Sequence, residues 1–212
     1  MKTYIFDLDG TLLDSMGVWL NIDIAFLEKR GLAVPADYAD KISPMSFTEA
    51  ATYTIERFGL PDSVDGLLRE WNGMAESAYS QTVQMKPHAK EYLLALRERG
   101  ARLAIATSAM PGLYELALRN HGIYDWFSVI CNSGEVGYGK SRPDVFLLTA
   151  QRLGVQPRDC VVFDDILEAV KSAKSIGMTV CAVYDKAAEN DWEKIKETAD
   201  YAILGFQDAP VF

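Results

Sequence analysis

The sequence has few cysteines, no long hydrophobic run and fewer basic than acidic residues. Its three cysteines, Cys131, Cys160 and Cys181, stand far apart and without the spacing of metal ligands. This pattern argues against a zinc site or a disulfide framework and favours buried free thiols. No apolar stretch approaches the roughly 18 residues of a membrane span, and acidic residues stand near the N-terminus where a signal peptide would be apolar. We therefore expect a cytoplasmic protein with no membrane partner.

The excess of acidic residues limits the partners that the chain can bind. With 21 lysines and arginines against 30 acidic residues, its formal net charge is −9 at pH 7. Such a chain is a poor candidate for non-specific binding to nucleic acid or to a membrane surface. An anionic substrate would need positive charge supplied locally, by a metal ion and a few placed cations. The 212 residues, of which 49% are hydrophobic, suffice for one main domain and a small second one.

Short apolar runs alternate with helix-like segments over most of the chain, which is typical of an α/β fold. Glycines such as Gly100, Gly154 and Gly177 follow the helix-like segments, and no tight hairpin signal separates the runs. The pattern predicts a Rossmann-like parallel sheet with helices on both faces. The strand-like runs are Tyr4–Phe6, Leu103–Ala106, Val129–Cys131, Val161–Phe163, Val180–Val183 and Tyr201–Leu204. The helix-like segments are Ala89–Arg99, Leu113–Asn120, Pro143–Leu153 and Ile166–Ile176.

The alternation is interrupted between residues 15 and 82, where the pattern is helical almost throughout. We interpret residues 15–82 as a small all-helical cap domain, inserted into a core domain made of residues 1–14 and 83–212. Because ligands of open α/β sheets bind at the carboxyl ends of the strands, a cap inserted there would cover the site as a lid. The helices predicted in the cap are Val18–Lys29, Ser46–Phe58 and Val64–Tyr79.

The most informative motif follows the first apolar run and reads Asp7-Leu8-Asp9-Gly10-Thr11. Two carboxylates at the tip of a buried strand repel each other and lose solvation, which costs stability. A bound cation would offset that cost. Because aspartate and glycine also favour turns, the motif taken alone is more readily explained as a turn.

Polar segments at three other predicted strand ends complete a set at one edge of the sheet. They are Thr107-Ser108, Gly139-Lys140-Ser141-Arg142-Pro143-Asp144 and Asp164-Asp165. Taken singly, these segments have ordinary explanations as a turn or N-cap, a solvated surface lysine and a helix-capping pair. Their common position at strand ends makes one shared site more credible than four coincidences.

These residue types suit phosphoryl transfer. Mg²⁺ prefers oxygen ligands, which Asp7 and Asp165 can supply from two strands. A hydroxyl with its neighbouring amide can hold phosphate oxygens, and one lysine can balance the remaining negative charge. A carboxylate can attack phosphorus, and a second carboxylate two residues away can protonate the leaving oxygen and then activate water.

The combined motifs resemble those of the haloacid dehalogenase superfamily over nearly the whole chain. The helical insert after the first motif resembles the β-phosphoglucomutase-like branch. The resemblance implies that Asp7 is the nucleophile and a Mg²⁺ ligand, and that Asp9 is the general acid/base and a ligand through its backbone carbonyl. It further implies that Asp165 is a direct metal ligand and that Asp164 is a second or water-mediated one.

The same resemblance implies which residues hold the phosphate group, namely Gly10, Thr107, the Ser108 amide and Lys140. The chain also departs from the family pattern. Ile166 and Glu168-Ala169 stand where the fourth motif often has small residues, so we expect the support of Asp165 to differ. Ser141-Arg142 replaces the frequent proline after the lysine, and we interpret Arg142 as a surface residue.

The leading hypothesis is a Mg²⁺-dependent phosphatase that hydrolyses a small phosphorylated metabolite through an aspartyl-phosphate on Asp7. A sugar-phosphate mutase is the first alternative. It is disfavoured because the Ser43–Thr48 segment, a candidate specificity loop, lacks the arginine with which β-phosphoglucomutases hold a distal phosphate. The same segment is equally well explained as a turn with Ser46 as helix N-cap. A non-catalytic phospho-acceptor module is the alternative of another class, and the order of the motifs argues against it.

Several features stay unassigned at the level of sequence. Lys41 is a weak candidate for a Schiff-base lysine because its neighbours suggest a solvated position. Trp19 and Trp71 could line a pocket in the cap but are more often core residues. We expect a monomer or a weak homo-oligomer, and the sequence does not indicate the natural substrate or the pathway.

Overall fold

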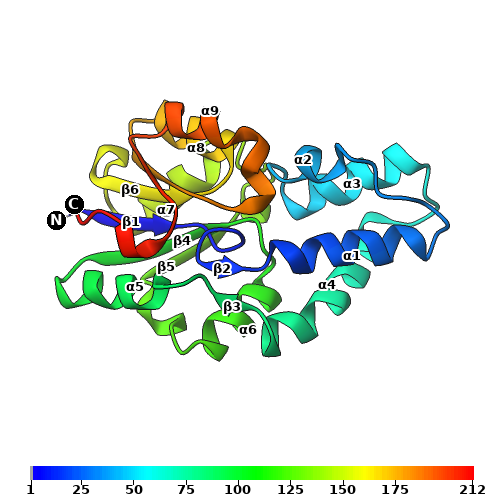
Figure 1. Ribbon diagram of the computed structural model, residues 1–212, viewed down its shortest axis with the longest axis horizontal. Coiled ribbons are helices and arrows are strands. Elements are labelled where there is room, and N and C mark those ends of the chain that lie inside the picture. The colour runs from blue at the N-terminus through cyan, green and yellow to red at the C-terminus, as the bar shows by residue number, and fades with distance from the viewer. Residues whose placement is uncertain (1) are drawn as a thin grey trace.

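The computed structural model describes residues 2–212 and has a parallel β-sheet at its centre (Figure 1). Six strands pair in the order β5-β4-β1-β6-β7-β8, and every pairing is parallel. Each strand overlaps one of the predicted apolar runs, so the predicted α/β fold is confirmed. The strands are β1 (Thr3–Phe6), β4 (Arg102–Thr107), β5 (Val129–Asn132), β6 (Cys160–Asp164), β7 (Thr179–Val183) and β8 (Tyr201–Ile203).

Helices cover both faces of the sheet because the side chains of a strand alternate between its two faces. In β1, Tyr4 and Phe6 join one buried cluster and Ile5 joins another on the opposite face. All three cysteines are buried free thiols, as predicted. The helices on the first face are α5 (Ala89–Glu98) and α6 (Pro111–Asn120), and those on the second are α7 (Asp144–Leu153), α8 (Leu167–Ser175) and α9 (Trp192–Thr198).

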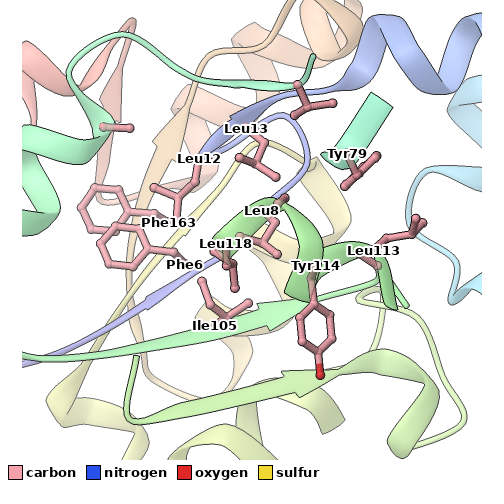
Figure 2. Close-up of a cluster of buried hydrophobic side chains, with 14 of the residues drawn as sticks. Phe6, Leu8, Leu12, Leu13, Tyr79, Ile105, Leu113, Tyr114, Leu118 and Phe163 are labelled. Carbon is pink, nitrogen blue, oxygen red and sulfur yellow. The ribbon is translucent and has the colours of Figure 1, made fainter. Parts of the chain in front are cut away.

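Aromatic and leucine side chains anchor both sides of the acidic motif. Phe6 of β1 and Phe163 of β6 stack with their ring centroids 4.8 Å apart (Figure 2). Leu8, Leu12 and Leu13, from the turn that follows β1, are fully buried in the same cluster. The acidic residues between them are therefore held on a rigid, close-packed base.

Along the sequence, a helical insert follows β1 and precedes the other strands of the sheet. In space, the insert lies beyond the carboxyl edge of the sheet (Figure 1). The chain leaves through β2 (Leu13–Asp14) and returns through β3 (Gln84–Met85), which pair antiparallel, so the two connections lie side by side. The insert contains the predicted helices with small shifts of their ends. Its helices are α1 (Met16–Glu28), α2 (Tyr38–Ile42), α3 (Phe47–Phe58) and α4 (Val64–Gln81).

Local sequence signals explain where the cap helices begin and end. Ser46 and Glu49 form a reciprocal capping box at the start of α3, which confirms Ser46 as its N-cap. Gly59 ends α3 in the left-handed conformation. Helices α2 and α9 were not predicted, because five and seven residues are too few to display a helical period. No helix within residues 2–212 is both long enough and apolar enough to span a membrane.

The topology brings the predicted polar segments to one edge. Strand β1 pairs in register with β4 on one side and with β6 on the other. Asp7, Thr107 and Asp164, which end or follow these strands, therefore share the carboxyl edge of the sheet. The helical insert departs from this same edge, so it lies over the polar segments.

Candidate active site

Three carboxylates form a compact buried group at the carboxyl edge of the sheet. One oxygen from each of Asp7, Asp164 and Asp165 lies within 4.8 Å of the other two. The exposed fractions of these residues are 4%, 0% and 2%. The backbone N–H of Asp7 donates to the Phe163 carbonyl at 2.9 Å, which extends the pairing of β1 with β6 past the end of β1. The strands thus fix the spacing of the carboxylates.

Lys140 is the positive charge at this group. Its side chain is 98% buried, and its ammonium pairs with Asp7 and, at 2.8 Å, with Oδ2 of Asp164. The Ser172 hydroxyl of α8 donates to the Lys140 carbonyl at 2.6 Å and holds its backbone on the core. Burial lowers the pKa of Lys140, but Asp164 and Asp7 more than offset this effect and raise it above its usual range. Lys140 is therefore a permanent cation in the site.

The carboxylates still outnumber the cation, and their pKa values reflect this. Burial raises the pKa of Asp7 to about 7, with Asp164 and Asp9 adding to the rise and Lys140 opposing it. Burial also raises the pKa of Asp165, and the carboxylates of Asp164 and Asp7 raise it further. Three buried carboxylates and one ammonium leave an excess of negative charge that a divalent cation would neutralise. The carboxylate oxygens are hard donors of the kind that Mg²⁺ prefers.

The turn after β1 supports Asp165. The Thr11 hydroxyl donates to Asp165 Oδ1 at 2.9 Å. Gly10 has a φ of +83°, and a β-carbon there would lie 2.8 Å from Cγ of Asp165. The backbone N–H of Gly10 donates to the Leu13 carbonyl at 3.0 Å and closes the turn, whose positive φ at this position favours glycine. A phosphate contact of Gly10 stays a prediction. Sequence reasoning did not predict that Thr11 would support Asp165, although Thr11 belongs to the first motif.

Asp9 is not a member of the three-carboxylate group, and its side chain is held by Ser15 and by the cap helix α4. Its Oδ1 accepts hydrogen bonds from Ser15 at 2.5 Å and from the hydroxyl of Tyr79 in α4. Trp19 of α1 donates from Nε1 to the Tyr79 hydroxyl at 2.7 Å. Burial raises the pKa of Asp9, and the hydrogen bonds from Ser15 and Tyr79 limit the rise. Sequence reasoning missed Ser15 and Tyr79, and Trp19 proves to be part of this chain of contacts.

The predicted phosphate-binding hydroxyls lie at the end of β4. Thr107 is buried, and its Oγ1 accepts a hydrogen bond from the Ala109 N–H at 3.0 Å. Ser133, in the 3₁₀ turn Ser133–Glu135 after β5, donates to the Ser108 hydroxyl at 3.2 Å. Within residues 2–212 neither hydroxyl bonds to the carboxylate group. Ser133 had no motif that could have marked it.

The remaining unassigned residues have structural positions. Arg142 pairs with Asp144 and stacks on Tyr138 with a side chain that is 51% exposed, which confirms its surface position. Lys41 is exposed on α2. Trp71 is buried in the cap against Phe26 and Phe47.

Comparisons with known proteins agree with this geometry. The family model described as haloacid dehalogenase-like hydrolase matches residues 1–177. The chain is 34% identical over 180 residues to a bifunctional riboflavin kinase/FMN phosphatase of Arabidopsis thaliana; this match covers 84% of the chain but only 47% of that protein. It is 31% identical over 187 residues to a protein named probable pseudouridine-5'-phosphatase of Drosophila melanogaster, which covers 85% of the chain and 80% of that protein. It is 27% identical over 178 residues to a phosphorylated carbohydrates phosphatase of Thermotoga maritima, covering 84% and 82%.

Solved structures share the whole fold, including the helical insert. A β-phosphoglucomutase from Clostridium difficile matches with a TM-score of 0.83 and 20% identity, covering 99% of this chain and 93% of that one. CbbY from Rhodobacter sphaeroides in complex with phosphate matches with a TM-score of 0.85 and 20% identity, covering 98% and 96%. The predicted resemblance to the β-phosphoglucomutase-like branch is thus confirmed at the level of fold. The chain belongs to the haloacid dehalogenase-like hydrolases and is a phosphatase of that family.

Proposed function

We propose that the protein hydrolyses the phosphate monoester of a small metabolite, with Mg²⁺ as cofactor and Asp7 as nucleophile. The observation that carries this proposal is the buried Asp7 carboxylate, which pairs with Lys140 and lies within 4.8 Å of the carboxylates of Asp164 and Asp165. A structural role alone does not account for three buried carboxylates beside a single lysine, because such a cluster costs stability. A catalytic role in the reaction of an anionic substrate does account for this cluster.

The donor set fits a magnesium ion. Asp7, Asp165 and Asp164 offer carboxylate oxygens within 4.8 Å of one another, and the backbone carbonyl of Asp9 is the further ligand we propose. When bound, the ion neutralises charge on the phosphate oxygens and lowers the pKa of the Asp7 carboxyl. The residues of the chain supply every other function in the reaction.

In the first step the Asp7 carboxylate attacks phosphorus, and the bond from phosphorus to the ester oxygen breaks. Asp9 donates its proton to that leaving oxygen, in keeping with the raised pKa that burial gives it. In the second step Asp9 accepts a proton from water, the water oxygen attacks phosphorus, and the bond from phosphorus to the Asp7 carboxylate oxygen breaks to release inorganic phosphate and free Asp7. Lys140, Thr107 and the Ser108 amide hold the phosphate oxygens through both steps.

We propose that the cap, residues 15–82, selects the leaving group. Relatives of the chain include phosphatases whose names specify phosphorylated carbohydrates and pseudouridine 5'-phosphate, which supports a small phosphorylated metabolite as substrate. Hydrolysis is preferred to mutase chemistry because Ser43–Thr48 carries no basic residue to hold a second phosphate.

A turnover screen over phosphate monoesters with Mg²⁺ tests the proposal. Asp7→Asn is expected to lower the rate of phosphate release by a factor of at least about 10³. Asp14→Asn, an equal change of charge at an exposed position after the same turn, is the matched control and should retain activity. Phosphate release by Asp7→Asn at the rate of the unmodified protein would contradict the mechanism. Conversion of a sugar phosphate to its isomer with a bisphosphate primer would favour the mutase instead.

A further inference from the structure

One carboxylate oxygen joins the cap to the loop that carries the catalytic lysine. Oε2 of Glu49, in the first turn of α3, accepts the Ser46 N–H at 2.8 Å. The same oxygen accepts the N–H of Gly139, the residue before Lys140, at 2.6 Å. Hydrogen bonds to a carboxylate are stronger than those between neutral groups. The oxygen therefore fixes the start of the cap helix and the core loop to each other.

The fit of the two segments is close enough to require a glycine. A β-carbon on Gly139 would clash with the Pro44 carbonyl oxygen and would lie 2.6 Å from Cα of Met45. Gly139 does not have a positive φ, so its backbone conformation is open to other residues. The approach of the cap segment, rather than the backbone conformation, demands glycine here.

Lys140 is thus held from two sides. Ser172 of α8 fixes its carbonyl on the core side at 2.6 Å. Glu49 fixes the preceding amide from the cap side. We propose that Glu49 is a positioning residue that couples the seating of the cap to the placement of the Lys140 ammonium against Asp7. This inference rests on the proposed function, in which Lys140 holds the phosphate.

The alternative is that Glu49 serves only as the helix-capping partner of Ser46. The two roles can be separated because Ser46 shares the capping box but makes no bond to Gly139. Ser46→Ala is therefore the matched control, which weakens the start of α3 and spares the contact with the core. Gln at position 49 keeps an acceptor oxygen and a capping box, so Glu49→Gln is the conservative variant.

The experiment combines amide hydrogen exchange with kinetics. In Glu49→Ala we expect the Gly139 amide to exchange at least about tenfold faster, and kcat to fall about tenfold or more because a misplaced group is costly. Gly139→Ala should lower kcat in the same way from the other side of the contact. Ser46→Ala and Glu49→Gln should stay within about threefold of the unmodified protein in both readouts.

The outcomes separate the coupling from the function itself. Equal losses in Ser46→Ala and Glu49→Ala would overturn the proposal, because helix capping would then explain both. Unchanged exchange of the Gly139 amide in Glu49→Ala would also overturn it. If no phosphate ester is hydrolysed, the proposed function fails, but the exchange measurement still reports the contact because it needs no turnover.

Discussion

Replacing Lys140 is expected to make the stability of the fold depend on a divalent cation. The Lys140→Met change keeps the length and burial of the side chain but removes the ammonium that pairs with Asp7 and Asp164. Both carboxylates then stay buried without their cation. Removing one partner of a buried ion pair costs about 3–5 kcal/mol. For a chain of this size each kcal/mol of lost unfolding free energy lowers the midpoint temperature of thermal unfolding by about 2–4 °C, so this midpoint should fall by about 6–20 °C.

The loss should grow with pH. Burial and the neighbouring carboxylate raise the pKa of Asp7 to about 7 even with Lys140 present, and without it the pKa rises further. When the pKa of a carboxyl is higher in the folded than in the unfolded chain, the folded state loses stability as the pH rises above the pKa of the unfolded chain. The variant should therefore lose little unfolding free energy relative to the unmodified protein at pH 5, and should lose most at pH 8.

Urea unfolding with and without Mg²⁺ measures the effect. The cation should restore much of the lost stability of Lys140→Met at pH 8, because it supplies the charge that the lysine supplied. Lys41→Met, at an exposed position on α2, is the matched control and should unfold like the unmodified protein. A Lys140→Met protein that is as stable as the unmodified one at pH 8 without Mg²⁺ would refute the charge balance described for the site.

Three other changes test separate parts of the structure. Burial raises the pKa of Asp23 from 3.8 to about 7, so Asp23→Asn should stabilise the fold by up to about 4 kcal/mol at pH 8 and hardly at pH 4 in urea unfolding. Tyr79→Phe removes a hydrogen bond that lowers the pKa of Asp9, so the pH–rate limb of that group should move to higher pH; an unmoved limb would contradict the contact. Gly10→Ala should weaken Mg²⁺ binding at least about tenfold in calorimetry, since its β-carbon would lie 2.8 Å from the carboxyl carbon of Asp165, a proposed metal ligand. Gly31→Ala, with a positive φ but open space around it, is the control for backbone strain.

Most of the fold was predictable because its four central strands, β1, β4, β6 and β7, are buried on both faces. Such strands appear in the sequence as short apolar runs, and the glycines after the helices mark the ends of the connecting segments. The short elements were not predictable. Strands β2 and β3 contain two residues each, and their pairing depends on the return of the chain after the whole helical insert.

The carboxylates and the lysine of the candidate site could be found because each stands directly beside a strand or a recognisable motif. Their supporting partners could not. Tyr79 is 70 residues from Asp9, and Glu49 is 90 residues from Gly139. Nothing in the sequence pairs them, because each contact forms only when the cap is seated on the core. The altered support of Asp165 that the departure at Ile166 led us to expect stays a prediction, and the hydroxyl that supports Asp165 in the structure comes from Thr11.

The two aspartates of the first motif have different surroundings, and this difference assigns their proposed roles. Asp7 faces the lysine and the other carboxylates of the core, so its charge is set by elements that the sheet holds rigidly. Asp9 is bound by Ser15 and by Tyr79, which belong to the connection into the cap and to the cap itself. Separate environments allow neighbouring carboxyls to serve as nucleophile and as acid. Proton transfer by Asp9 should therefore respond to the position of the cap, whereas attack by Asp7 should respond to the charge of the core.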